Sequence, residues 1–346
     1  MRKVFVYMLM VLALVAFGGA AMAQDPICGS LTGADCEVLT QAAAAQSGLN
    51  SATFTFTLDI AVGEQAIPLT GNGSFAIDPA VKAELHAIDP ATLSADPTAA
   101  LNVMSAALKG FDASLNVNAM GLPLELVLVD GVGYLNFESL APMLGGAEAG
   151  IPAGWAGLDL NGAVEMMAPM LQGMDMEQAQ AQVDPAQQEA MMAAVAQNMT
   201  VVRADDVDGQ AVFVSTFDFG GLLQNEAFLG LVMSQATPGQ ELTEEQLAQM
   251  NEMLTAMGDG INISFTQNID LTTYYTTGFT FDFDLDGATL AAAAASVGEE
   301  TGSVEDISVS LKLNFADFNA APALSAPAGA QVSTIQELMG AMGGGF

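Results

Sequence analysis

The chain has 346 residues and a formal net charge of −34, and 51% of its residues are hydrophobic while only 13% are charged. This excess of acid excludes nucleic acid and anionic membrane surfaces as partners, because like charges repel. The same acidic residues keep an apolar chain soluble, so the charge alone does not indicate a function. The lone histidine, His86, argues against histidine-based catalytic triads and metal sites, and we expect it on an exposed strand or turn.

Residues 1–23 have the pattern of a secretory signal peptide. Two basic residues precede an apolar run over 4–17, and small residues follow it up to Ala23. An uncleaved membrane anchor is the alternative, but the run is shorter than the roughly 20 residues that span a bilayer. The sequence therefore predicts a secreted or periplasmic protein. It is not expected to be lipidated, because residues 25–27 before Cys28 are not small.

Residues 24–49 hold both cysteines of the chain, Cys28 and Cys36. In an oxidising compartment each is the only partner for the other, which predicts a disulfide. Two thiolates without further Cys or His ligands do not make a tetrahedral metal site. We expect the disulfide to close a local loop outside the sheet, beside a short helix.

Period-two alternation of apolar and polar residues predicts half-buried strands along most of the remaining chain. Residues 53–60 show it clearly, with Phe54, Phe56, Leu58 and Ile60 on one side. One-sided strands of this kind are typical of antiparallel sheets. The same pattern recurs around Leu115 and Val117 and over 124–128, 212–214, 261–271, 279–285 and 307–315.

Short glycine-containing motifs, three Asp-Gly pairs and one Gly-Asn-Gly, predict tight turns. Residues 71–73, 130–131, 208–209 and 286–287 supply the positive φ angles that short hairpins need. Each motif therefore marks an expected end of a strand.

Three segments between the strands have methionine at helical spacing: 162–176, 184–199 and 243–257. Ordinary core packing is one interpretation of these faces. Because methionine is flexible and polarizable, an adaptable apolar cavity is another. Copper(I) binding by thioethers is a third, which a single histidine and spacing suited to burial disfavour. The candidate cavity methionines are Met166, Met170, Met250 and Met257.

These elements predict an α+β fold in which a large antiparallel sheet is covered by apolar helices. If the sheet is strongly curved around the helices, the space between them is a cavity large enough for a lipid. The alternation of residues does not reveal that curvature.

Three stretches carry a resemblance to a known family. "VDGVGYLNF" and "GWAGLDL" lie between residues 129 and 160, and "SVSLKLNFADFNAAPALSAPAGA" covers 308–330 with an Asp317-Phe318-Asn319 turn. Together they resemble the LolA-like superfamily of lipoprotein localisation factors, particularly its LppX and LprG branch of lipid carriers.

The resemblance implies a single half-barrel domain over residues 50–330, wrapped around helices and enclosing a cavity that carries acyl chains. It places Tyr134 on the strand after a hairpin and Trp155 near the cavity rim. The alternative for Trp155 is an ordinary buried core residue that contacts no ligand. Residues 331–346 would form a short helix or a mobile tail.

The resulting hypothesis is a non-enzymatic carrier of a lipid or other long apolar ligand, with no cofactor, no metal and no catalytic residue. A membrane or a lipid-export protein is a further candidate partner, and the oligomeric state is open. A structural or adhesive surface protein with a solid core is the alternative. The residues predicted to line the cavity are Phe54, Phe56, Leu58, Leu115, Val117, Tyr134, Trp155, Met166, Met170, Met250, Met257, Ile263 and Phe265.

Residues 282–287 copy the start of a calcium-binding loop. Asp282, Asp284 and Asp286 occupy positions 1, 3 and 5, but position 12 is Ala293 where a bidentate glutamate should stand. The same aspartates fit the outer face of a strand, and we favour that interpretation.

Overall fold

The computed structural model describes residues 28–31, 33–88, 97–119, 121–140, 154–172, 190, 193–225, 258, 260–296, 305–334 and 336–337. The expected signal peptide, the expected helix over 243–257, and Met250 and Met257 lie outside the described residues. The chain divides into two compact units. We call Met1–Leu49 with Glu189–Ser308 the α2 unit, and Asn50–Gln188 with Val309–Phe346 the β1 unit.

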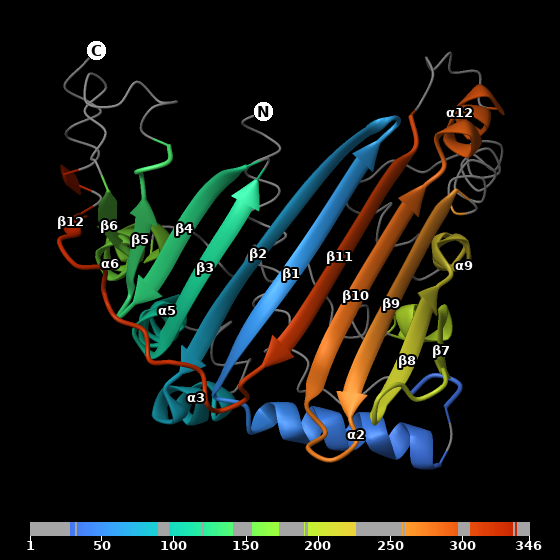
Figure 1. The fold of residues 1–346 in the computed structure, drawn as a ribbon, viewed down its shortest axis with the longest axis horizontal. Coiled ribbons are helices and arrows are strands. Elements are labelled where there is room, and N and C mark those ends of the chain that lie inside the picture. Colours follow the sequence, from blue (N-terminus) through green and yellow to red (C-terminus); the bar gives the residue numbers. More distant parts are fainter. Residues whose placement is uncertain are drawn as a thin grey trace. The chain divides into compact units, whose positions relative to one another are not determined.

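The β1 unit is built on strands in the order β12-β6-β5-β4-β3-β2-β1-β11 (Figure 1). Consecutive strands from β1 to β6 pair antiparallel, whereas β12 pairs parallel with β6, so the sheet is mixed. Residues 331–333 are therefore a strand, where a helix or tail was expected. The strands are β1 Ser51–Val62, β2 Gln65–Ile77, β3 Phe111–Ala119, β4 Leu122–Val129, β5 Val132–Asn136, β6 Trp155–Asp159, β11 Ile307–Ala316 and β12 Gln331–Ser333.

The turn predicted at residues 71–73 is wrong, because Gly71 and Gly73 lie in the middle of β2. Gly73 pairs with Phe54 of β1, and a Cβ atom on Gly73 would come within 2.6 Å of the Phe54 ring. Gly71 makes the same room for the ring of Phe56. Because these glycines have no side chain, the two aromatic rings can lie across β2. The hairpin turn lies instead at Gly63, whose φ is 57°.

The register gives the β1 unit one apolar and one polar face, as the alternation predicts. The polar face carries Thr53, Thr55, Thr57, Asn72, Ser74, Ser114, Asn116, Asn118, Glu125 and Asn136. The apolar face carries Phe54, Phe56, Leu58, Leu69, Phe75, Leu115, Val117, Leu124, Leu126, Leu128 and Leu135.

Three helices belong to the β1 unit: α3 Pro79–His86, α5 Pro97–Gly110 and α6 Leu160–Gln172. In the view of Figure 1, α5 and α6 lie behind β3 to β6. A Cβ atom on Gly133 of β5 would lie 3.4 Å from Leu160, which places the start of α6 on the apolar face. The predicted helix over 162–176 is thus present, whereas α3 and α5 were not predicted.

Helix α3 overturns the expectation that His86 lies on a strand or turn. Asp78 caps the helix by accepting a hydrogen bond from the Ala80 amide at 2.8 Å, and Pro79 occupies its first position. An Asp-Pro pair is a helix start signal, and the sequence interpretation overlooked it at this position.

The α2 unit has strands in the order β10-β9-β8-β7, paired antiparallel. Its predicted turn at Asp208-Gly209 is confirmed, with φ of 51° and 79°. The predicted turn at Asp286-Gly287 is wrong, because a helix starts there. The elements are α2 Ala34–Ser47, β7 Met199–Arg203, β8 Gln210–Phe217, α9 Phe219–Leu223, β9 Ile261–Asp270, β10 Thr276–Leu285 and α12 Gly287–Ser296.

Helix α2 packs on one end of this sheet and closes a core. Leu39 and Ala42 of the helix meet a set of fully buried strand residues. Leu31, Val38, Leu271 and Tyr274 pack around the cluster. The buried strand residues are Val201, Ala211, Phe213 and Ile269.

The predicted α+β organisation, dominated by antiparallel strands, is confirmed, and in neither unit does the strand order close on itself. Met199, expected at the end of a helix, instead opens β7. Within the described ranges, no helix is long and apolar enough to cross a membrane.

Candidate functional site

Five of the predicted cavity residues share the apolar face of the β1 unit. Phe56, Leu58 and Val117 are buried there, whereas Phe54 and Leu115 are half-buried. The register places Phe54 beside Gly73 and Gly73 beside Leu115, so these side chains lie in one row across three strands. These five residues thus share one face, while their role in lining a cavity stays a prediction.

The same face continues beyond the predicted residues. Leu126 of β4 lies opposite Leu115, and Leu135 of β5 lies opposite Leu126. Both are half-buried. At the other end of the row, the rings of Phe54 and Phe315 lie 6.4 Å apart between centroids. Alternation marked Leu126 and Phe315 as inward-facing apolar residues, but the register was needed to show that they and Leu135 form a continuous surface.

Tyr134 and Trp155 do not belong to this face. Tyr134 pairs with Val127, and Trp155 pairs with Asn136, so both are one position out of phase with the apolar row. The Tyr134 ring lies over Gly157 on the polar side of the sheet and is buried. The structure thus separates these two aromatic residues from the other predicted cavity residues.

Of the four candidate methionines, only Met166 has a described side chain. It is half-buried on α6, two residues after the buried Val164. Met170 also belongs to α6, but its side chain lies outside the described part, as do Met250 and Met257. Of the helical methionine faces, the structure thus describes only the part at Met166.

Ile263 and Phe265 lie in the α2 unit, on the same face of the sheet as its buried core. The Phe265 ring lies 5.3 Å from Phe281 and 6.1 Å from Phe279. The three phenylalanines are half-buried and form an aromatic cluster of their own.

A hollow of about 330 Å³ opens on the polar face of the β1 unit. Its lining combines hydroxyl and amide side chains with apolar residues such as Phe315 and Pro322. The Ser74 and Ser114 hydroxyls are hydrogen-bonded to each other at 2.9 Å. The hollow is lined by Thr53, Phe54, Thr55, Asn72, Gly73, Ser74, Ser114, Asn314, Phe315, Ala316 and Pro322.

The Asp317-Phe318-Asn319 turn ties the chain after β11 to the start of β1. Asp317 and Asn319 have φ of 51° and 57°. The Asn319 side chain accepts a hydrogen bond from the Asn50 amide at 2.6 Å, and the Thr53 hydroxyl donates to Asp317 at 2.8 Å. Its role in the structure is to fix an end of the sheet.

The predicted disulfide between Cys28 and Cys36 is confirmed. The loop was expected to lie outside the sheet, and this expectation is wrong. The Ser30 hydroxyl donates a hydrogen bond to the Val201 carbonyl of β7 at 2.8 Å. A disulfide indicates an oxidising, extracytoplasmic environment.

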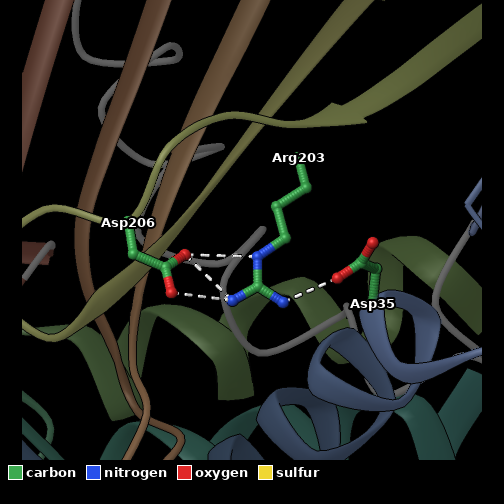
Figure 2. Close-up of polar contacts among 3 residues, drawn as sticks. All are labelled: Asp35, Arg203 and Asp206. Atoms are coloured by element: carbon green, nitrogen blue, oxygen red, sulfur yellow. Dashed lines mark hydrogen bonds and ion pairs between the residues drawn. The ribbon is translucent and has the colours of Figure 1, made fainter.

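An arginine cluster, which the sequence analysis missed, joins α2 to β7 (Figure 2). The Arg203 guanidinium lies 2.6 Å from Asp35 and 2.9 Å from Asp206. It also lies 5.8 Å from the centroid of the Phe213 ring. The hydrogen bonds to Asp206 and then Asp35 raise the pKa of Arg203 above its usual value. The cluster is fully engaged in tying two elements together.

The calcium-loop aspartates have structural positions. Asp282 and Asp284 lie on β10, and Asp286 accepts hydrogen bonds from the amides of Ala288 and Thr289, as a helix cap does. The hydrogen bonds from Thr289 lower the pKa of Asp286. Among the described residues there is no group of three or more His, Cys, Asp or Glu placed to hold a metal ion.

No protein-family model and no curated protein sequence matches this chain. The assignment of a function therefore rests on the apolar face and on the compartment that the disulfide indicates.

Proposed function

We propose that the protein is a secreted or periplasmic, non-enzymatic carrier that binds a lipid or another long apolar ligand against the apolar face of the β1 unit. A half-barrel curvature of the sheet around its helices belongs to this proposal. The observation that carries it is the row of large apolar side chains that remain half-buried on this face: Phe54, Leu115, Leu126 and Leu135.

The chemistry of the face suits a long apolar ligand. The row runs across β1 to β5 without a charged residue, while charged and amide side chains of the same strands lie on the opposite face. Covering the part of these leucine and phenylalanine side chains that is still exposed contributes about 25 cal/mol per Å² of apolar area. With few polar groups to orient a ligand, selectivity among acyl chains would be broad.

Helices α5 and α6 supply the second wall in this proposal. Leu101 of α5 and Val164 of α6 are buried, and the Ser105 hydroxyl of α5 lies 3.5 Å from the Asn161 side chain of α6. The helices thus pack on one another, while Met166 of α6 is left half-buried as an adaptable lining residue.

A structural or adhesive protein without a ligand is the second candidate. The closed core beneath α2 favours it, since Phe213 and Ile269 are fully buried there. If the apolar face of the β1 unit is closed in the same way, nothing would bind to it.

The test compares two single substitutions on neighbouring residues of β3. Leu115→Asp puts a charge on the apolar face, and Asn116→Asp puts the same charge on the exposed opposite face. A fluorescent fatty acid is titrated into the parent and both variants, and thermal melting checks that each is folded. We expect the parent and Asn116→Asp to bind equally, and Leu115→Asp to bind at least tenfold more weakly.

Native mass spectrometry of protein purified without detergent provides the independent measurement. A co-purified acyl species supports the carrier. A bare mass, together with no uptake of the fluorescent fatty acid by the folded parent, would contradict the carrier and favour the structural protein.

A further inference from the structure

Strand β7 is the last strand in the order of the α2 unit, and no further strand of the described chain pairs with its outer side. The Ala204 amide donates to Val212, and the Asp218 amide donates to Asn198. Since hydrogen-bonded pairs alternate in an antiparallel ladder, Thr200 and Val202 bond to β8. The backbone groups of Met199, Val201 and Arg203 therefore point outward, away from β8.

The disulfide loop occupies the middle of this outer edge. Ser30 donates its hydroxyl hydrogen to the outward carbonyl of Val201. Gly29 approaches so closely that a Cβ atom would lie 3.2 Å from the Val201 side chain and 3.5 Å from its amide nitrogen. Gly29 also has a φ of 53°, which suits glycine. The loop satisfies one backbone acceptor of the edge and sterically blocks the adjoining donor.

A disulfide and an ion pair hold the loop in place. The disulfide ties Cys28 to Cys36 on the first turn of α2. Next to it on the same turn, Asp35 pairs with Arg203 at the end of β7. The loop is therefore fastened at both ends, and this holds Gly29 and Ser30 against the edge.

We propose that the outer edge of β7 is a strand-pairing surface for a second copy of this chain, and that residues 28–31, held by the Cys28–Cys36 disulfide, are the built-in cover that keeps the copies apart. An uncovered edge pairs readily with another edge. Two β7 strands can pair antiparallel about a two-fold axis at Val201, which places Thr200 of one copy opposite Val202 of the other.

The composition of the strand supports a second copy as the occupant. β7 contains no acidic residue, in a chain whose net charge of −34 otherwise keeps copies apart. Val202, on the side of β7 away from the core, is 48% exposed and would be covered in such a pair. Pairing at β7 thus brings two copies together along a strand that carries no acidic residue of its own.

The first experiment removes the cover. Sedimentation equilibrium at 0.15 M NaCl, where the Debye length is about 8 Å, compares the parent with Cys28→Ser/Cys36→Ser and with Gly29→Val, which pushes the loop off the edge. Far-UV circular dichroism checks the fold. We expect both variants to stay folded and to self-associate at least tenfold more strongly than the parent.

The second experiment locates the contact. Adding Thr200→Asp/Val202→Asp to the cysteine-free variant places carboxylates directly opposite one another in the pair, and should restore the parent's behaviour. Thr55→Asp/Val207→Asp is the control, with the same residue types, the same charge and exposed positions. It should leave the association unchanged.

Three results would overturn the proposal. The uncovered variants could remain folded and associate no more than the parent. Both pairs of aspartates could suppress association equally, which would indicate a general charge effect. Both uncovered variants could unfold, which would show that the loop is required for the fold itself and does not merely cover an edge.

Discussion

The core beneath α2 and the apolar row of the β1 unit are built on similar one-sided strands, but their side chains are buried to different extents. In the α2 unit, helix α2 covers one end of the sheet, and Phe213 and Ile269 are less than 2% exposed. In the β1 unit, Phe54, Leu115 and Leu126 form a half-buried row, although Phe56 and Val117 beside it are buried. Alternation therefore reports which side of a strand is apolar, but it does not report how completely that side is covered.

The difference follows from what lies against each sheet. Helix α2 presents small residues such as Ala42, which is 2% exposed, so the helix lies close against Val201 and Ala211. Close approach excludes space for anything else. On the β1 unit, α6 meets the sheet through the larger Leu160, which stands over Gly133. The core beneath α2 is closed, whereas one row of the apolar face of the β1 unit is only half covered.

The largest expected effect is on the closed core. Phe213→Ala should lower the free energy of unfolding by about 3–5 kcal/mol, because the surrounding side chains cannot collapse into the void. Phe54→Ala, the same truncation on a half-buried ring, should cost about 1–2 kcal/mol. Urea denaturation followed by circular dichroism measures both.

Trp155 makes the comparison sharper, because the only tryptophan lies in the β1 unit and its fluorescence follows that unit. Phe213→Ala should move the circular dichroism transition more than the fluorescence transition. Equal costs for the two truncations would show that both faces are equally closed, and would remove the basis of the comparison.

Loss of the disulfide should have the next largest effect. Cys28→Ser/Cys36→Ser frees a short loop, which costs about 2.5 kcal/mol in chain entropy. Because the loop contacts β7, the loss should fall on the closed core and not on the β1 unit. A shift of the Trp155 fluorescence transition as large as the circular dichroism shift would contradict this assignment.

A smaller effect is expected for a truncation within helix α6. Met166→Ala should cost less than about 1.5 kcal/mol if the half-buried side chain borders free space, compared with about 2–5 kcal/mol in a filled core. Leu101→Ala on α5, where the leucine is buried, is the internal control and should cost more. If Met166→Ala is as costly as Leu101→Ala, the methionine face is ordinary core.

Much of the fold could be predicted because the strands are long and one-sided. The segment predicted at 53–60 is the middle of β1, and the segment predicted at 279–285 falls within β10. The error at Gly71 and Gly73 has a physical cause. Glycine permits a turn, but it also permits an aromatic ring to cross the strand, and only the pairing with β1 decides between them.

The candidate site was harder to predict because it depends on the register between strands. Tyr134 and Trp155 lie close in sequence to apolar strand residues, yet they belong to the opposite face. A shift of one residue transfers a side chain to the other face of a sheet. The arginine cluster was missed for a related reason: Arg203 and Asp35 are 168 residues apart, and no local pattern connects them.

The smallest expected effect concerns pH and the turn after β9, which holds Leu271 and Tyr274 against the closed core. The Asp270 carboxylate accepts hydrogen bonds from the amide and hydroxyl of Thr273 and the amide of Thr272, and these lower its pKa. A lowered pKa means that the contribution to stability is present at neutral pH and is lost as the pH falls through the pKa of the folded state. Because the carboxylate lies at the surface, the contribution should stay below about 1 kcal/mol.

Asp270→Asn should therefore be slightly less stable than the parent at pH 7, and the difference should shrink as the pH falls from about 5 toward 2. Asp284→Asn, on the exposed side of β10, makes the same change in net charge and serves as the control. A difference for Asp270→Asn that is constant over this range, or one that Asp284→Asn reproduces, would show that the turn is held by contacts other than the carboxylate.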